Sequence, residues 1–146
     1  MSFRISNIYK SLVRQIIDSV EIMKRNGVVP EIEYFDWDAG GNESEMPKVD
    51  VVGLADWTFA ENGGLWLIHA GITVSTVNDD NRFREMAIID ALHDIWGEQC
   101  VIPLRDDNGI EHSQLVVKEF EMLTAGASSK RNYRPIGLVL ARTSGG

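Results

Sequence analysis

Asp90, His93 and Asp94 lie within one turn of each other in a segment, residues 81–96, that we predict to be a helix. A carboxylate beside an imidazole can act as a general acid/base pair. Such a pair needs a nucleophile or an oxyanion donor, and the sequence around it offers neither. We therefore predict a solvated helix face and no catalytic residue, and keep a small acid/base enzyme built around Asp90 and His93 as the alternative.

The other residues that could react or bind a metal are scattered along the chain. His69, His93 and His112 fall in a predicted strand, a helix and a turn, and none has the two-histidine helical spacing of a metal site. Cys100 is the single cysteine, which excludes an intrachain disulfide and a cysteine-rich zinc site. We predict that it is a small buried apolar residue. No metal and no cofactor are expected.

Composition and charge limit the class of protein. The chain has 146 residues, 44% of them apolar, and a formal net charge of −8, as expected for one globular domain. This charge argues against a surface that binds DNA phosphates, although repulsion suits a channel through which DNA slides. No run of about 18 apolar residues occurs, so we expect a soluble, intracellular protein without membrane contact.

Residues 47–96 form the unit around which the rest of the chain is organised. Alternation from Val49 to Phe59 predicts a strand with one buried face, which holds the odd-numbered residues. The turn residues 61–64 lead into a second strand, 65–77, and residues 78–81 can cap the helix that follows. The predicted core of this unit is Trp66, Ile68, Ile72, Val74, Phe83, Ile88, Leu92 and Ile95.

The remaining segments add one helix and further strands. Apolar residues at three- and four-residue steps predict a first helix that is capped by Ser6 or Asn7 and ends near Arg25. Further strands are predicted at 31–38, 98–104, 113–123 and 135–142, with loops at 39–46 and 124–134. We predict one α+β domain over residues 1–142, a mostly antiparallel sheet of hairpins with two helices packed on one face, and a flexible tail at 143–146.

Charge is segregated along the sequence. Residues 31–45 contain six acidic residues and no basic one, whereas residues 124–142 contain four basic residues and no acidic one. Such a chain suits a head-to-tail interface, in which one patch of a subunit meets a different patch of the next. The predicted subunit or partner interface is Tyr34, Phe35, Asp36, Trp37, Glu43, Glu45, Lys130, Arg131, Tyr133 and Arg134.

The order of these elements resembles the tail terminator proteins of tailed bacteriophages. The resemblance rests on the N-terminal helix, the aromatic acidic strand Glu31–Trp37, the strand entry Met46–Val49, the long hairpin, the acid-rich helix start and the terminal hairpin. It implies a structural protein of the virion, not an enzyme, that assembles as a six-membered ring, caps the finished tail tube and forms the surface joined to the head.

The implied partners follow from that role. They are further copies of the chain, the tail tube protein and a head-completion or neck protein, with DNA passing through the opening without specific binding. The expected location is the phage tail, after assembly in the host cytoplasm. Another tail or neck component, such as a tail completion or tube-like protein, stays an alternative because it would share the α+β fold and the oligomerisation.

Overall fold

A computed structural model describes residues 4–40, 42–78 and 82–143. The helical elements are α1 (Ile5–Arg25), α2 (Trp37–Gly40), the 3-10 turn η1 (Glu43–Glu45) and α3 (Phe83–Trp96). The strands are β1 (Ile32–Tyr34), β2 (Asp50–Asn62), β3 (Leu65–Val77), β4 (Val101–Arg105), β5 (Glu111–Met122), β6 (Gly126–Ala127) and β7 (Arg131–Thr143).

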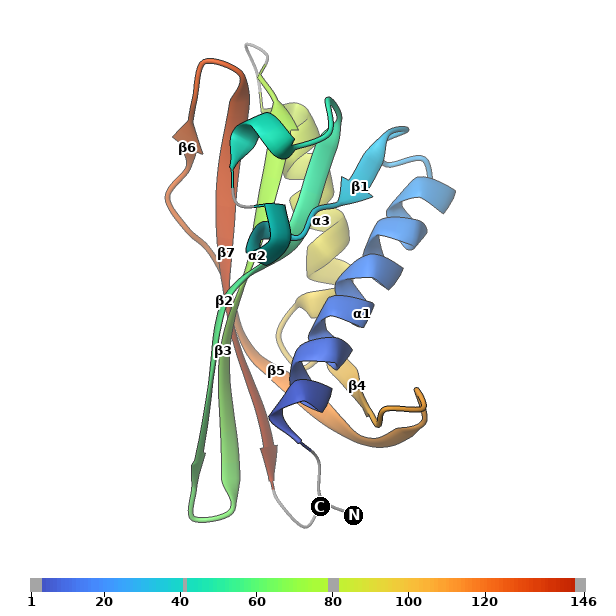
Figure 1. Ribbon diagram of the computed structural model, residues 1–146, viewed down its shortest axis with the longest axis vertical. Coiled ribbons are helices and arrows are strands. Elements are labelled where there is room, and N and C mark those ends of the chain that lie inside the picture. Colours follow the sequence, from blue (N-terminus) through green and yellow to red (C-terminus); the bar gives the residue numbers. More distant parts are fainter. Residues whose placement is uncertain (1–3, 41, 79–81, 144–146) are drawn as a thin grey trace.

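One seven-stranded sheet runs through the molecule in the order β1-β2-β3-β7-β5-β4, and β6 pairs with β7. Every neighbouring pair is antiparallel except β1 with β2. Figure 1 shows the two long helices, α1 and α3, on the same side of a strongly twisted sheet whose longest strands are β2, β3 and β7. The predicted α+β class, with a mostly antiparallel sheet and two helices on one face, is confirmed.

The β2–β3 hairpin has the predicted tight turn. Asn62 pairs with Leu65, and the two residues between them, Gly63 and Gly64, have φ values of 58° and 86°. Positive φ at both positions is the geometry of a type I′ turn, which glycine adopts without a steric cost. On β3 the predicted inward set is buried: Trp66, Ile68, Ala70, Ile72 and Val74.

The predicted buried face of β2 is wrong for half of the strand. A β-bulge at Asp56, whose φ is 48°, inserts one residue between the pairs Ala55–Gly71 and Trp57–Ala70. One extra residue exchanges the two faces of a strand. Consequently Val52 and Leu54 face the helices before the bulge, and Trp57 and Phe59 do so after it. The alternation of residue types alone does not reveal this change.

Helix α3 turns a different stripe toward the core than predicted. Phe83 is 78% exposed and Ile95 is half-buried, whereas Ile88 and Leu92 are buried as expected. The side chain that completes the buried stripe is Trp96, whose indole N–H donates to Ser19 Oγ of α1 at 3.1 Å. This contact satisfies the polar end of a fully buried ring, and it joins the two long helices.

Two boundary predictions need correction. Residues 124–134 are not a free loop, because β6 pairs with the start of β7 and Ser128 Oγ accepts the Arg131 N–H at 3.0 Å. The strand predicted at 31–38 ends at Tyr34, since Asp36 Oδ1 accepts the N–H groups of Asp38 and Ala39 and starts α2.

The predicted helix caps have mixed outcomes. The first helix starts at Ile5, so Asn7 accepts the Arg4 N–H at 3.0 Å from inside the first turn. Of the predicted cap at 78–81, residues 79–81 lie outside the described residues, and Asn78 donates to the carbonyl of Ser128 at 3.2 Å. Of the predicted tail at 143–146, Thr143 instead belongs to β7, and residues 144–146 lie outside the described residues.

Candidate interaction surface

Arg131, the first residue of β7, is the centre of the predicted basic segment, yet its side chain points into the protein. It is 5% exposed. Its guanidinium donates to Ser75 Oγ at 2.7 Å, to the carbonyls of Pro47 and Val49 at 3.0 and 2.7 Å, and to the carbonyl of Ser75 at 3.1 Å. Burial lowers the pKa of Arg131, but arginine stays charged in proteins. Arg131 therefore holds the entry to β2 against β3.

Tyr133 and Glu43 join the basic and acidic segments within one subunit. The Tyr133 hydroxyl donates to a Glu43 carboxylate oxygen, which ties η1 to β7. Burial, and then this hydrogen bond, raise the pKa of Tyr133 to about 12. The same hydrogen bond, with a second from Ser128, holds the pKa of Glu43 below its usual value. The bond thus favours a neutral phenol beside a charged carboxylate.

Arg134 is also engaged inside the chain. Its Nε lies 3.3 Å from Glu85 Oε2, and its Nη1 donates to the carbonyl of Leu123 at 2.8 Å. Glu85 is fully buried and pairs with Arg82 as well, at 2.8 Å. Two arginines and one carboxylate make a paired buried charge, which is costly to break from either side. This cluster fixes the start of α3 on the sheet.

A second buried carboxylate lies at the start of β2. Asp50 is 4% exposed, accepts the Val77 N–H at 2.8 Å and pairs with Arg84 Nε at 2.9 Å. Neither Asp50 nor Glu85 is among the residues predicted from the sequence. For Glu85 a signal existed, because it lies three residues before Ile88 and seven before Leu92, on the apolar stripe of the helix.

The aromatic acidic segment lies over the edge of β2. Phe35 is buried and meets the Trp37 ring edge-on at a centroid distance of 4.9 Å. Asp38 accepts a hydrogen bond from Tyr9 of α1 at 3.3 Å. Burial, and next the charge of Asp36, raise the pKa of Tyr34 to about 12. Carboxylates and ring faces therefore share this part of the surface.

These positions revise the predicted interface. Phe35 and Arg131 are buried, and Arg134 is held by Glu85, so these three residues have structural roles that the sequence did not indicate. Charges that are separated along the sequence meet within one subunit, since Glu43 touches Tyr133. An interface role stays a prediction for the exposed or half-buried remainder: Tyr34, Asp36, Trp37, Glu43, Glu45, Lys130 and Tyr133.

The sheet face opposite α1 and α3 carries a shallow groove of about 420 Å³ over β2, β3, β7 and β5. Its floor contains small residues, including Gly71 and Gly137, and three carboxylates line it: Asp56, Glu119 and Glu121. Among the described residues, no lysine or arginine lines this groove. The groove is therefore acidic, which disfavours phosphate-containing ligands.

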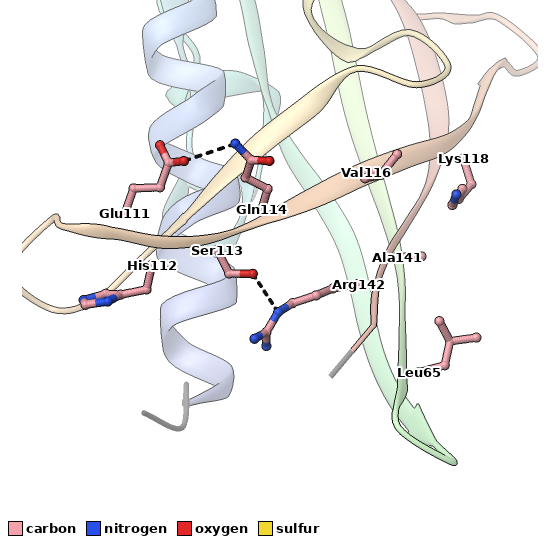
Figure 2. Close-up of a pocket in the computed structure, with 9 residues that line it drawn as sticks. All are labelled: Leu65, Glu111, His112, Ser113, Gln114, Val116, Lys118, Ala141 and Arg142. Carbon is pink, nitrogen blue, oxygen red and sulfur yellow. Dashed lines mark hydrogen bonds between the residues drawn. The ribbon is translucent and has the colours of Figure 1, made fainter. Parts of the chain in front are cut away.

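A second concavity, of about 640 Å³, lies where β5 diverges from the ends of β3 and β7, as Figure 2 shows. Ser113 Oγ accepts a hydrogen bond from Arg142 Nε at 2.9 Å, and Gln114 donates to Glu111 at 3.3 Å. The guanidinium of Arg142 also lies 4.3 Å from the centre of the Trp66 ring. An arginine cannot act as the base that a serine nucleophile needs, so this arrangement gives no support to catalysis.

The acid/base alternative also gains no geometric support. Asp90 and His93 are both described and both exposed on α3, and no hydrogen bond joins their side chains. The His93 ring instead meets Phe120 edge-on at 5.0 Å. Cys100 is half-buried, with its Sγ 3.8 Å from the carbonyl of Asp94. That none of these residues is catalytic stays a prediction.

Among residues 4–40, 42–78 and 82–143, no group of three or more His, Cys, Asp or Glu side chains could hold a metal ion. No helix in the described part of the chain has the length and apolar character needed to cross a bilayer. No protein-family model matches the sequence, and no curated protein matches it either.

Proposed function

We propose that this chain is a structural protein of a phage or prophage virion that forms a homo-oligomeric ring, caps the tail tube and provides the surface joined to the head. The observation that carries the proposal is the element order, an N-terminal helix, a long hairpin, a second helix and a terminal set of hairpins, folded with both long helices on one face of the sheet. The resemblance to tail terminator proteins rests on the same order.

The acidic groove suggests where the sheet face that no helix covers lies in this ring. We assign that face to the wall of the central opening, with α1 and α3 on the outside. Asp56, Glu119 and Glu121 then face the opening. Repulsion between carboxylates and DNA phosphates lets a genome pass without adhering, which agrees with the net charge of −8.

The contact between neighbouring subunits needs charged groups that form no ion pair with the described residues of their own subunit. Lys48 and Lys130 are exposed beside η1, whereas at the start of α2 Asp38 is exposed and Asp36 is half-buried. In a head-to-tail ring, the lysines of one subunit face the acids of the next. Exposed pairs contribute only about 0 to 1 kcal/mol each, so they select the orientation while aromatic contacts around Trp37 supply affinity.

The test measures mass in solution and particle shape by negative stain, alone and with tail tubes. The parent protein forms ring particles that cap the tubes, and the double variant Lys48→Glu/Lys130→Glu does not. Lys118→Glu is the matched control, because this exposed lysine lies in the other concavity. Absence of rings from the parent under all conditions, with or without tubes, would refute the ring. Rings formed equally by the double variant would refute only the proposed contact.

The same test separates the alternatives. A tube-like component would stack into extended tubes, and a neck component would bind the head side without closing the tube end. An enzyme built around Asp90 and His93 would lose a defined turnover when either is replaced by alanine, with its fold intact. We expect the alanine variants of Asp90, His93 and Cys100 to assemble as the parent does.

A further inference from the structure

The outer edge of β2 has no neighbouring strand from Trp57 to Asn62 in the described part of the chain. β1 pairs with β2 only from Asp50 to Val52. At Gly53, the next residue of β2, the Trp37 ring of α2 lies against the strand, since a Cβ on Gly53 would be 2.8 Å from that ring. Beyond the bulge the edge is bare, and Figure 1 shows this half of the hairpin at the margin of the sheet.

The opposite edge of the sheet is protected, which makes the open one more notable. β4 is five residues long and contains Pro103, which has no N–H to offer. The Arg105 N–H donates to Ser11 Oγ of α1 at 3.0 Å. On β2, residues 57–62 contain neither proline nor lysine, and Glu61 is their one charged side chain. Such an edge is a template for another strand.

The hairpin turn fixes which backbone groups point outward. In a hairpin closed by two residues, the flanking residues exchange hydrogen bonds, and such pairs alternate with pairs that do not. Because Asn62 pairs with Leu65, the N–H and C=O groups of Asn62, Ala60 and Thr58 point to β3. Those of Trp57, Phe59 and Glu61 therefore point away from the sheet.

We propose that this edge binds the same edge of a second copy of the chain, in an antiparallel two-fold pair with Phe59 opposite Phe59. In this register Trp57 of each copy lies opposite Glu61 of the other, and Thr58 lies opposite Ala60. All outward-pointing groups of residues 57–62 then find partners, and no other two-fold register pairs as many of them. The paired hairpins form one continuous sheet across the two copies.

The side chains agree with this register. Asp56 lies opposite Asn62 and Glu61 opposite Trp57, so no carboxylate faces another, whereas centring the pair on Glu61 would oppose two acids. On the helix side, Phe59 is the cross-strand partner of Ile68 and meets the Trp66 ring edge-on at 5.4 Å. Pairing extends this apolar row from Ile68 through both Phe59 rings to Ile68 of the other copy.

The two-fold pair is independent of the proposed ring. It uses the free half of β2, whereas the ring contact uses the surface around η1 and α2. A two-fold contact joins the same patch of two copies, and a ring contact joins unlike patches. The pair therefore doubles the mass of whichever unit exists without it, a single chain or a closed ring.

The first test compares Glu61→Pro with Glu61→Ala by mass measurement in solution over a range of concentrations. Proline removes the outward N–H of residue 61 without breaking a hydrogen bond to β3, and alanine keeps that N–H. We expect the alanine variant to match the parent and the proline variant to have half the mass at high concentration, with unchanged circular dichroism. Equal masses for all three proteins would overturn the proposal.

The second test reads the register by disulfide formation in a Cys100→Ala background. Residues 58 and 60 of opposite copies form a pair without hydrogen bonds, with Cα atoms about 4.5 Å apart, which suits a disulfide. The double variant Thr58→Cys/Ala60→Cys should give a covalent dimer on mild oxidation, and each single variant should give far less. Cross-linking at equal yield in the single variants, or in none of the three, contradicts the register and with it the pair.

Discussion

Replacement of Arg131 by alanine is expected to destabilise the fold strongly, although the sequence places this residue in an apparent surface loop. The substitution leaves the carbonyls of Pro47, Val49 and Ser75 and the hydroxyl of Ser75 without their donor. Hydrogen bonds to a charged group contribute about 1.5 to 3 kcal/mol each, but contributions within one cluster do not add. Leaving a buried acceptor unsatisfied costs about 1 to 3 kcal/mol, so for these clustered acceptors together we expect a loss of about 3 to 5 kcal/mol.

The assay is urea and thermal unfolding followed by circular dichroism. For a chain of about this length, each kcal/mol shifts the melting temperature by about 2 to 4 °C, so the expected decrease is roughly 6 to 20 °C. Lys130→Ala is the matched control, because the neighbouring lysine is exposed and its truncation should change stability by no more than about 0.5 kcal/mol. Arg131→Lys keeps the charge but not the planar fork, and should fall between the two.

The result that refutes this reasoning is a small effect. If Arg131→Ala unfolds within about 0.5 kcal/mol of the parent, the guanidinium does not hold β2 to β3, and its burial has no energetic consequence. A large loss would also explain why reversing the charge of Arg131 or Arg134 cannot test assembly. Such variants would fail through the fold, and only exposed lysines such as Lys130 report on an interface.

Three further predictions address the core, the β2 edge and the acidic segment. Leu92→Ala, at a fully buried position, should cost about 2 to 5 kcal/mol in unfolding free energy, and an unchanged melting temperature would contradict the core assignment. Gly53→Ala should cost about 1 to 3 kcal/mol, because its Cβ would lie 2.0 Å from the Phe35 carbonyl oxygen; equal unfolding curves would disprove the close approach. The pKa of Glu43 is lowered by Tyr133, so its stabilisation is present above its usual pKa of 4.5 and is lost as the pH falls through the lower folded value. We expect the free energy of unfolding, measured in urea above and below pH 4.5, to decrease less on acidification in Tyr133→Phe than in the parent. An equal decrease in both proteins would show that the hydrogen bond between Tyr133 and Glu43 is not formed.

Local patterns predicted the elements whose signal is local. The Gly63-Gly64 turn, the inward face of β3 and the first helix follow from glycine chemistry and from apolar periods of two and 3.6 residues. The bulge at Asp56 has no comparable signal in the sequence, because the positive φ of this aspartate depends on how β2 pairs with the neighbouring strand. It reversed the buried face of β2 and placed Trp57 and Phe59 on the helix side.

The sequence did not indicate which residues of the predicted interaction surface are buried or paired within the subunit, for a related reason. Runs of like charge suggest solvated faces, because isolated charges are costly to bury. Arg131 avoids that cost through the carbonyl of Pro47, and Arg134 and Glu85 avoid it by pairing with each other across 49 residues of the sequence. Only the fold reveals those partners, so the sequence could identify the charges but not which of them remain available to a neighbour.

The two edges of the sheet restrict how the proposed ring can close. A ring that continued the sheet from one subunit to the next would have to pair the open edge of β2 with β4 of the neighbour. β4 has few backbone N–H groups to donate to another strand, because Pro103 has none and the Arg105 N–H donates to Ser11. Helix α1 also packs against β4. Head-to-tail closure therefore relies on side-chain surfaces, as in the contact proposed around η1 and α2. The open edge of β2 stays available to an identical edge, with which it can pair in the register proposed above.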